Sequence, residues 1–315
     1  MSIYSANLIS SWYDKNYIKQ VNYLLKSSNH DVDDNIKAII VPHAGLHYSG
    51  KVAASAYGKI NWNLIDKIVI LCTFHRGESK LILPSFEIIK FPDRIMKVDS
   101  QSKTKLLNLD NSIVQSYNHF IDEHSFEVQL PFIMTLAKDG TTILPILVGR
   151  CQNLLEIAKS INNIIDSKTL IIITTDFTHY GPRFDYVVNK SGESLKEYLR
   201  EKDMKDVRAI ISNKPEQFEG KAVCGRCAIL LWMEMVKLLK LQKPKLIKYE
   251  RSSDGDDIIT NSVSYVSMVY YADMKGGLNK YDQWKIEIDN KIKIGEKIDI
   301  FKLSEQNILN IPRLS

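Results

Sequence analysis

The chain has 315 residues and a net charge of +5, with 44% hydrophobic and 25% charged residues. This composition is typical of a globular protein with a sizeable core, and no apolar run approaches the roughly 20 residues that span a bilayer. The basic residues are scattered along the chain and are not interleaved with aromatic residues. We therefore expect neither a membrane protein nor a nucleic-acid-binding protein.

The N-terminus lacks a basic segment followed by a long apolar stretch, so we expect no secretory signal and a cytoplasmic location. Four cysteines are too few for a disulfide framework in a chain of this length. They favour reduced thiols, a metal site or a catalytic role over structural disulfides.

Apolar periodicity predicts helices and strands in alternation. The predicted helices cover residues 17–25, the small residues after Gly50, and residues 122–132, 154–165, 189–211 and 228–241. The predicted strands are nearly continuous apolar runs, as expected inside a sheet, at residues 36–41, 67–72, 142–148, 170–175 and 262–271. We therefore predict an α/β fold over residues 1–273, a single domain with a mostly parallel or mixed central sheet flanked by helices.

Two parts of the chain do not fit this alternation. Residues 80–110 combine short apolar pairs with two prolines, which predicts an irregular or antiparallel excursion followed by a helix. Residues 274–315 contain alternating apolar and charged positions, which predicts a small C-terminal extension of short strands with a hairpin turn at Asp289-Asn290.

Three predicted strands run directly into a polar loop that contains a histidine. His43 follows the first strand, His75 follows the second, and Asp176 and His179 follow the strand over residues 170–175. In α/β proteins ligands bind at the carboxyl ends of the strands. One such histidine is often only a hydrogen-bonded loop residue, but the repetition of the pattern indicates a site.

Cys224 opens a Cys-Gly-Arg-Cys run before the predicted helix at residues 228–241. Two imidazoles and a thiolate leave open positions on a small transition metal such as Fe(II), Cu or Zn, which suits the binding of substrate or dioxygen. Cys224 is equally compatible with a small buried side chain. Its spacing from Cys227 also admits a thioredoxin-like dithiol.

Two further groups of titratable residues have both a structural and a functional interpretation. Asp176 lies three residues before His179, so its carboxylate is able either to cap the loop or to orient an imidazole that moves protons. Glu123 and His124 open a predicted helix, where an acidic residue caps free amides, but both side chains are also able to tune metal ligands.

Motifs of several common enzyme classes do not follow any predicted strand. The chain has no Gly-x-Ser-x-Gly elbow, no P-loop and no Gly-x-Gly-x-x-Gly run in that position. The serine hydrolase, nucleoside triphosphatase and dinucleotide-binding interpretations therefore lose their usual support.

The same residues resemble the Memo family, also called protein B of the AmmeMemoRadiSam system, whose fold is similar to that of class III, LigB-type extradiol dioxygenases. Five colinear blocks spanning about residues 5–272 carry the resemblance, namely Ser11-Trp12-Tyr13, PHAGLHYSG at 42–50, DEHSFEVQLPF at 122–132, TDFTHYGPRF at 175–184, and Val223-Cys224-Gly225-Arg226 with Ser262-Val263-Ser264-Tyr265.

The resemblance implies a mononuclear metal site formed by His43, His75 and Cys224, with Fe(II) as the first choice and Cu or Zn as alternatives. It also implies that His179 is an acid/base residue. On this interpretation Asp176 orients His179, and Glu123 and His124 tune the metal ligands.

The chain departs from the family pattern beside one of these ligands. The family's Gly-Pro-Ser-His-His block is replaced here by Cys72-Thr73-Phe74-His75-Arg76. The second histidine is therefore absent, and Arg76 brings a permanent positive charge. Phe74 adds bulk near the mouth of the pocket. From the charge of Arg76 and the bulk of Phe74 we expect an anionic ligand or a narrower pocket.

The sequence leaves functions from different classes open. The first is a metal-dependent redox enzyme with dioxygenase-like activity on a small molecule. The second is a non-catalytic protein that holds a metal or a peptide in a vestigial dioxygenase site. The third is an oxidoreductase that uses Cys224 and Cys227 without a metal. The resemblance also implies partner proteins of the AmmeMemoRadiSam system.

Overall fold

The computed structural model describes residues 2–8, 10–28, 31–76, 81–109, 113–150, 153–256 and 258–273. The chain divides into one unit over Met1–Tyr271 and a second over Ala272–Ser315. The short strands and the hairpin turn predicted for residues 274–315 lie outside the described residues, so they remain predictions.

The centre of the first unit is a row of parallel strands. In spatial order these are β8 (Thr142–Val148), β3 (Lys67–Thr73), β9 (Thr169–Thr174) and β2 (Ile36–Val41). The next strand, β12 (Ser262–Tyr271), runs antiparallel to β2. The predicted α/β fold with a mostly parallel, mixed sheet is confirmed.

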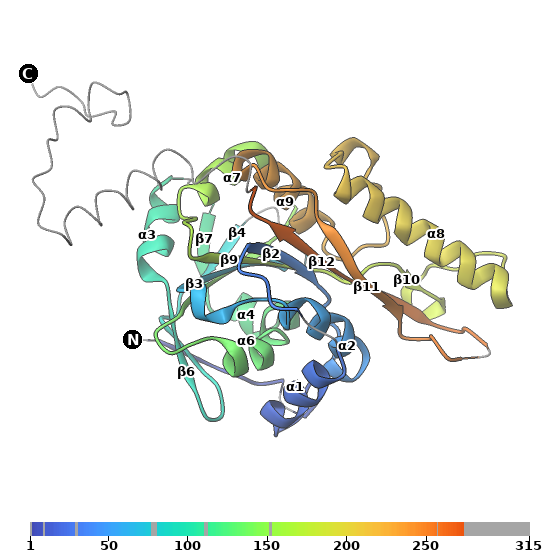
Figure 1. Cartoon of the computed structure of the whole chain (residues 1–315), viewed down its shortest axis with the longest axis horizontal. Helices are drawn as coiled ribbons and strands as arrows, with labels where there is room; N and C mark the ends of the chain where they lie inside the picture. Colours follow the sequence, from blue (N-terminus) through green and yellow to red (C-terminus); the bar gives the residue numbers. More distant parts are fainter. Residues whose placement is uncertain are drawn as a thin grey trace, which may run out of the picture. The chain divides into compact units, whose positions relative to one another are not determined.

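These central strands are buried because both faces of the sheet are covered. Every residue of β9 is buried, and its sequence, TLIIIT, has no polar alternation. Figure 1 shows α7 (Leu154–Asn162) and α9 (Arg226–Leu239) on one face of the sheet. Helices α1 (Tyr17–Lys26) and α2 (Leu46–Tyr57) lie on the other face. Continuous apolar strands are the sequence signature of this arrangement.

Shorter strands extend the sheet on both sides of its parallel centre, and further helices lie between them in the chain. The remaining strands are β1 (Ile3–Ser5), β4 (Leu81–Pro84), β5 (Ile88–Lys90), β6 (Ile95–Val98), β7 (Ile113–Ser116), β10 (His179–Tyr180) and β11 (Lys245–Arg251). The remaining helices are α3 (Ser100–Leu109), α4 (Asn118–Ile121), α5 (His124–Glu127), α6 (Leu130–Leu136), α8 (Gly192–Ile211) and the 3-10 turns η1 (Trp62–Leu64), η2 (Pro182–Phe184) and η3 (Pro215–Gln217).

Two predicted helices begin or end elsewhere than expected. Helix α2 begins at Leu46, so the small residues after Gly50 lie in its later turns, where they are buried. The single helix predicted over residues 122–132 is divided into α5 and α6. Glu123 caps the start of α5, and Pro131 lies in the first turn of α6, where a proline is tolerated because its missing N–H has no helical partner. The excursion predicted for residues 80–110 does contain the antiparallel pair β5 and β6, followed by α3.

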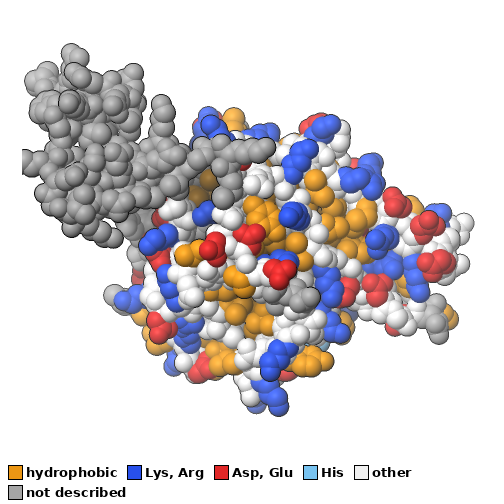
Figure 2. Space-filling view, in the orientation of Figure 1, with side chains coloured by type: hydrophobic (Ala, Val, Ile, Leu, Met, Phe, Trp, Pro, Cys, Tyr) orange, Lys and Arg blue, Asp and Glu red, His pale blue; other side chains and the backbone are white. Residues whose placement is uncertain are grey.

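The surface and the helices agree with the composition. Among the described residues, no helix is both long enough and apolar enough to cross a membrane. On the face shown in Figure 2, Lys and Arg side chains are interspersed with Asp and Glu side chains.

Candidate metal centre

Three neighbouring strands deliver the candidate residues to one edge of the sheet. Strand β9 lies between β3 and β2. His43 follows β2, His75 follows β3, and Asp176 follows β9. Because the three strands are parallel, their carboxyl ends meet at the same edge, as predicted for a binding site in an α/β protein.

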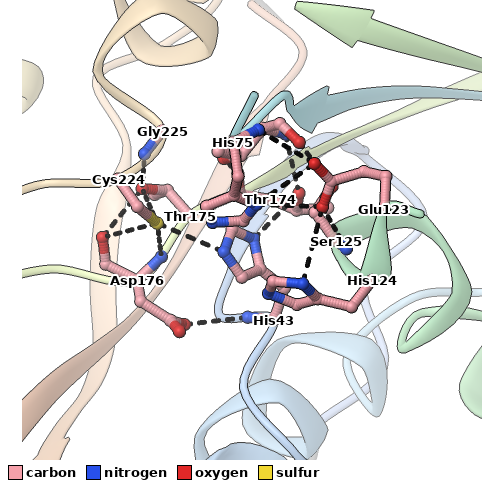
Figure 3. A network of polar contacts seen from close by, with 11 residues as sticks. His43, His75, Glu123, His124, Ser125, Thr174, Thr175, Asp176, Cys224 and Gly225 are labelled. Atoms are coloured by element: carbon pink, nitrogen blue, oxygen red, sulfur yellow. Dashed lines mark hydrogen bonds and ion pairs between the residues drawn. The ribbon is translucent and has the colours of Figure 1, made fainter. Parts of the chain in front are cut away.

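Cys224 reaches this edge from the loop before α9. Its Sγ lies 3.2 Å from Nε2 of His43 and 3.2 Å from the backbone nitrogen of Asp176 (Figure 3). The loop approaches closely because Gly225 donates its N–H to Oγ1 of Thr175 at 3.0 Å. A Cβ at position 225 would lie 2.5 Å from that oxygen. Glycine is therefore needed to place the thiol against the histidine.

The donor atoms of His43, His75 and Cys224 lie within 4.8 Å of one another. One ion bound at about 2.1 Å to nitrogen and 2.3 Å to sulfur in tetrahedral geometry would separate these two atoms by about 3.6 Å. The observed separation of 3.2 Å between Sγ of Cys224 and Nε2 of His43 is close to that value. His43 is buried, whereas the His75 side chain is 33% exposed. The group thus fits a metal and has an open side.

Each histidine is oriented through its other ring nitrogen. Nδ1 of His75 lies 2.9 Å from Oε1 of Glu123, and the backbone N–H of His75 donates to Oε2 of the same carboxylate. Nδ1 of His43 lies 3.2 Å from Oγ1 of Thr174. These contacts leave Nε2 of both rings for the shared space in Figure 3. A carboxylate behind a histidine is a typical arrangement around protein-bound metals.

The charges of the group favour a thiolate at Cys224 beside a protonated His75, which must lose its proton before it can bind a metal. Burial opposes the thiolate of Cys224, but the charge of His43 and hydrogen bonds from His43 and His75 lower its pKa to about 6. Burial raises the pKa of Glu123, yet the hydrogen bond and charge of His75 outweigh it and lower that pKa to about 2. Burial lowers the pKa of His75, but its hydrogen bonds to Cys224 and Glu123 raise it to about 10.

In the metal-free protein we expect Cys224 to react with iodoacetamide much faster than Cys227 at pH 7, because the thiolate is the nucleophile. The rate at Cys224 should rise through about pH 6, whereas burial raises the pKa of Cys227. Mass spectrometry of alkylated peptides across a pH series measures both rates. Equal rates, with a disulfide on mild oxidation, would instead support the dithiol interpretation.

His124 lies beside the candidate ligands, and its Nδ1 is 3.7 Å from Oε1 of Glu123. Its ring stacks on the His75 ring, with centroids 4.5 Å apart and planes 20° apart. Although donor atoms of His75, Glu123 and His124 also lie within 4.8 Å, the lone pairs of stacked rings lie in parallel planes and cannot meet at one ion. Burial and the charges of His43 and His75 lower the pKa of His124 to about 3, so the ring is neutral at pH 7.

Asp176 and His179 have different partners, so the predicted contact between them is not observed. The Asp176 carboxylate accepts the backbone N–H of His43 at 2.9 Å, and burial raises its pKa. Nδ1 of His179 donates to the carbonyl oxygen of Phe177 at 2.9 Å. Because a carbonyl only accepts, the neutral ring carries its proton on Nδ1 and its lone pair on Nε2. A backbone carbonyl oxygen therefore orients one edge of the His179 ring, while the charge of His179 lowers the pKa of Asp176 against the effect of burial.

The departures from the family pattern lie outside the ligand group. Arg76 is exposed and forms an ion pair with Asp122 at 3.2 Å. Phe74 is only 5% exposed and packs edge-on against His119. The expectation that Phe74 narrows the pocket therefore remains a prediction.

Several contacting residues were not predicted from the sequence. Trp12 stacks on His124, and Thr174 contacts His43. Ser125 donates to the carbonyl oxygen of Thr73 at 2.6 Å, and Gln129 donates to that of Pro42 at 3.1 Å. The polar residues at alternate positions of 123–129 were the available signal, since this period differs from that of an amphipathic helix.

Comparison with known proteins assigns the chain to a family. The profile of the family described as Memo-like protein matches residues 5–269. A MEMO1 family protein of Aquifex aeolicus is 30% identical over 246 residues, which cover 74% of this chain and 85% of the relative. The MEMO1 family protein C4H3.04c of Schizosaccharomyces pombe is 27% identical, with 84% and 98% covered. Protein MEMO1 of Rattus norvegicus is 29% identical, with 73% and 84% covered.

The family match covers nearly all of the first unit of the chain. The profile covers the strands that carry His43 and His75, and also the loop that carries Cys224. The chain belongs to the Memo-like protein family.

Proposed function

We propose that this protein binds one transition-metal ion through His43, His75 and Cys224 and is a redox enzyme with dioxygenase-like activity on a small molecule. The observation that supports the proposal is the convergence of two imidazole nitrogens and one thiol sulfur within 4.8 Å at the carboxyl ends of adjacent strands. Three protein ligands leave coordination positions for other molecules, which is typical of catalytic and not of structural sites.

The ligand set is compatible with Fe(II), Cu or Zn, and Fe(II) is our first choice because of the resemblance to extradiol dioxygenases. Such an ion would supply open coordination positions for a small-molecule substrate or dioxygen. Within the chain, Glu123 holds the His75 ring by its Nδ1 edge, and Thr174 holds the His43 ring. Both contacts keep Nε2 directed at the shared space.

His179 is the proposed acid/base residue. Its Nδ1 is committed to the carbonyl oxygen of Phe177, so Nε2 is available to accept a proton from a substrate hydroxyl or thiol. The charge of His179 affects the pKa values of Asp176 and of His124, which supports its proximity to the candidate metal centre.

We expect the His179→Ala variant, loaded anaerobically with Fe(II), to consume oxygen at least about 100-fold more slowly than the loaded wild type. The measurement is oxygen uptake across a panel of catechols and small thiols. His47→Ala is the matched control, because His47 is exposed and contacts Asp14. Its rate should equal that of the wild type.

The second candidate function is non-catalytic binding of a metal or of a small-molecule or peptide ligand. The loss of the second histidine of the family block, at Arg76, favours it. If the protein bound metal stoichiometrically but consumed no oxygen with any of the metals, this result would support a binding function in place of an enzymatic one.

A further inference from the structure

Three aromatic rings form a column that ends at a candidate metal ligand. The Trp12 indole stacks on the His124 imidazole, with centroids 4.2 Å apart and planes 21° apart. The opposite face of His124 stacks on His75 with similar geometry. Figure 3 shows the imidazole rings of His43, His75 and His124 gathered in one place. The His43 plane is nearly perpendicular to the other two, at 80° and 82°.

The column restrains His75 in a direction that hydrogen bonds do not. Glu123 contacts the edge of the His75 ring at Nδ1, which fixes the position of that edge but leaves rotation about the contact. Stacking against the face of the ring restrains this rotation, because tilting would separate the faces or press them together. Edge and face contacts together determine where Nε2 points.

The far end of the column is held by a buried carboxylate. Glu127 is fully buried and accepts the hydroxyl groups of Tyr4 and Tyr13 at 2.5 and 2.7 Å. It also accepts the backbone N–H groups of Asn7 and Leu8. These contacts hold the chain in place both before and after Trp12 in the sequence.

A second contact holds the Trp12 backbone itself. Its carbonyl oxygen accepts the N–H of Leu46 at 2.8 Å, at the start of α2. A Cβ at the neighbouring Gly45 would lie 3.3 Å from that oxygen. Trp12 is thus tied both to the loop that carries His43 and, through Tyr13 and Glu127, to the segment that carries His124.

We propose that Trp12 and His124 are positioning residues whose ring faces fix the plane of the His75 imidazole, and that Glu127 holds Trp12 in this column. His124 acts through its face and not through its nitrogens. The functional consequence, an effect on metal affinity, rests on the proposed metal-binding role of His75. The geometry of the column does not depend on any metal.

Paired variants separate the two ways in which His124 could act. His124→Phe keeps an aromatic face and removes both nitrogens, whereas His124→Ala removes both features. We expect His124→Phe to bind zinc with close to wild-type affinity, and His124→Ala to bind about 10- to 100-fold more weakly, as for other contacts that orient a ligand. Trp12→Phe and Trp12→Ala should behave in the same way. Competition with a chromophoric chelator measures the affinity.

The exposed His47 provides the matched control, since His47→Phe and His47→Ala should both bind as the wild type does. Equal losses in His124→Phe and His124→Ala would overturn the proposal in favour of a nitrogen-based role. Wild-type affinity in His124→Ala would overturn it as well.

A measurement on the metal-free protein keeps this test separate from that of the proposed function. With labelled histidine, we expect sharp ring resonances of His75 in the wild type and in His124→Phe, and exchange-broadened or multiple resonances in His124→Ala. If the wild type bound no zinc, the metal-binding function would be wrong, and the resonances alone would decide the positioning role. Identical sharp His75 resonances in all three proteins would contradict it.

Discussion

Removal of Cys224 or His43 as alanine variants is expected to abolish tight metal binding by this protein. Sγ of Cys224 and Nε2 of His43 lie 3.2 Å apart and share one space with His75, so each variant removes one of three donors. The loss of metal affinity should exceed the roughly 10- to 100-fold loss that follows removal of a group that only hydrogen-bonds to a metal ligand. Metal analysis of protein purified anaerobically from metal-replete medium measures this, together with chelator competition.

Cys227→Ala is the matched control for this experiment. Cys227 is a second free thiol in the first turn of α9, three residues beyond Cys224, and it is not part of the converging group. Its variant should retain the metal content of the wild type. Equally low Fe, Cu and Zn in the wild type and in both ligand variants would rule out the metal centre.

Replacement of Glu127 by glutamine is expected to lower the free energy of unfolding by about 3–5 kcal/mol, because four donors, two of them buried tyrosine hydroxyl groups, converge on its buried carboxylate. The glutamine amide would present its own donors to groups that are themselves donors. The individual losses are not additive, since the donors share one partner and one segment. Urea unfolding measures the effect as a lower midpoint with an unchanged slope.

Glu156→Gln is the control for the loss of a carboxylate at the surface. Glu156 pairs with Lys159 at 2.8 Å, but both side chains are more than half exposed. Its removal should change the free energy of unfolding by less than about 0.5 kcal/mol. A Glu127→Gln variant as stable as the Glu156→Gln variant would show that the buried contacts contribute little.

Predictions from local pattern succeeded where the pattern was long. The continuous apolar runs of β2, β3 and β9 identified these strands, and the polar residues that follow them include His43 and His75. Strands β1, β5 and β10, by contrast, have only two or three residues, which is too short for a period to be detected.

Predictions of contact between side chains were less successful. Asp176 and His179 are close in sequence, which made a contact between them plausible. The folded loop gives them different partners, the His43 backbone N–H and the Phe177 carbonyl oxygen. Pro131 marks the break between α5 and α6 in the sequence. No local sequence pattern marks the contact between the Glu123 carboxylate and the His75 ring.

By itself, the amino-acid sequence determined the central strands, the α/β class and the loops in which the site residues lie. These properties follow from burial, which is recorded in the local alternation of apolar and polar residues. Only the tertiary structure decided that β9 lies between β3 and β2, that Cys224 meets His43 across 181 residues, and that Trp12 stacks on His124. Such contacts depend on strand order and on close backbone approach, as at Gly225, and residues far apart in the chain carry no local pattern that specifies them.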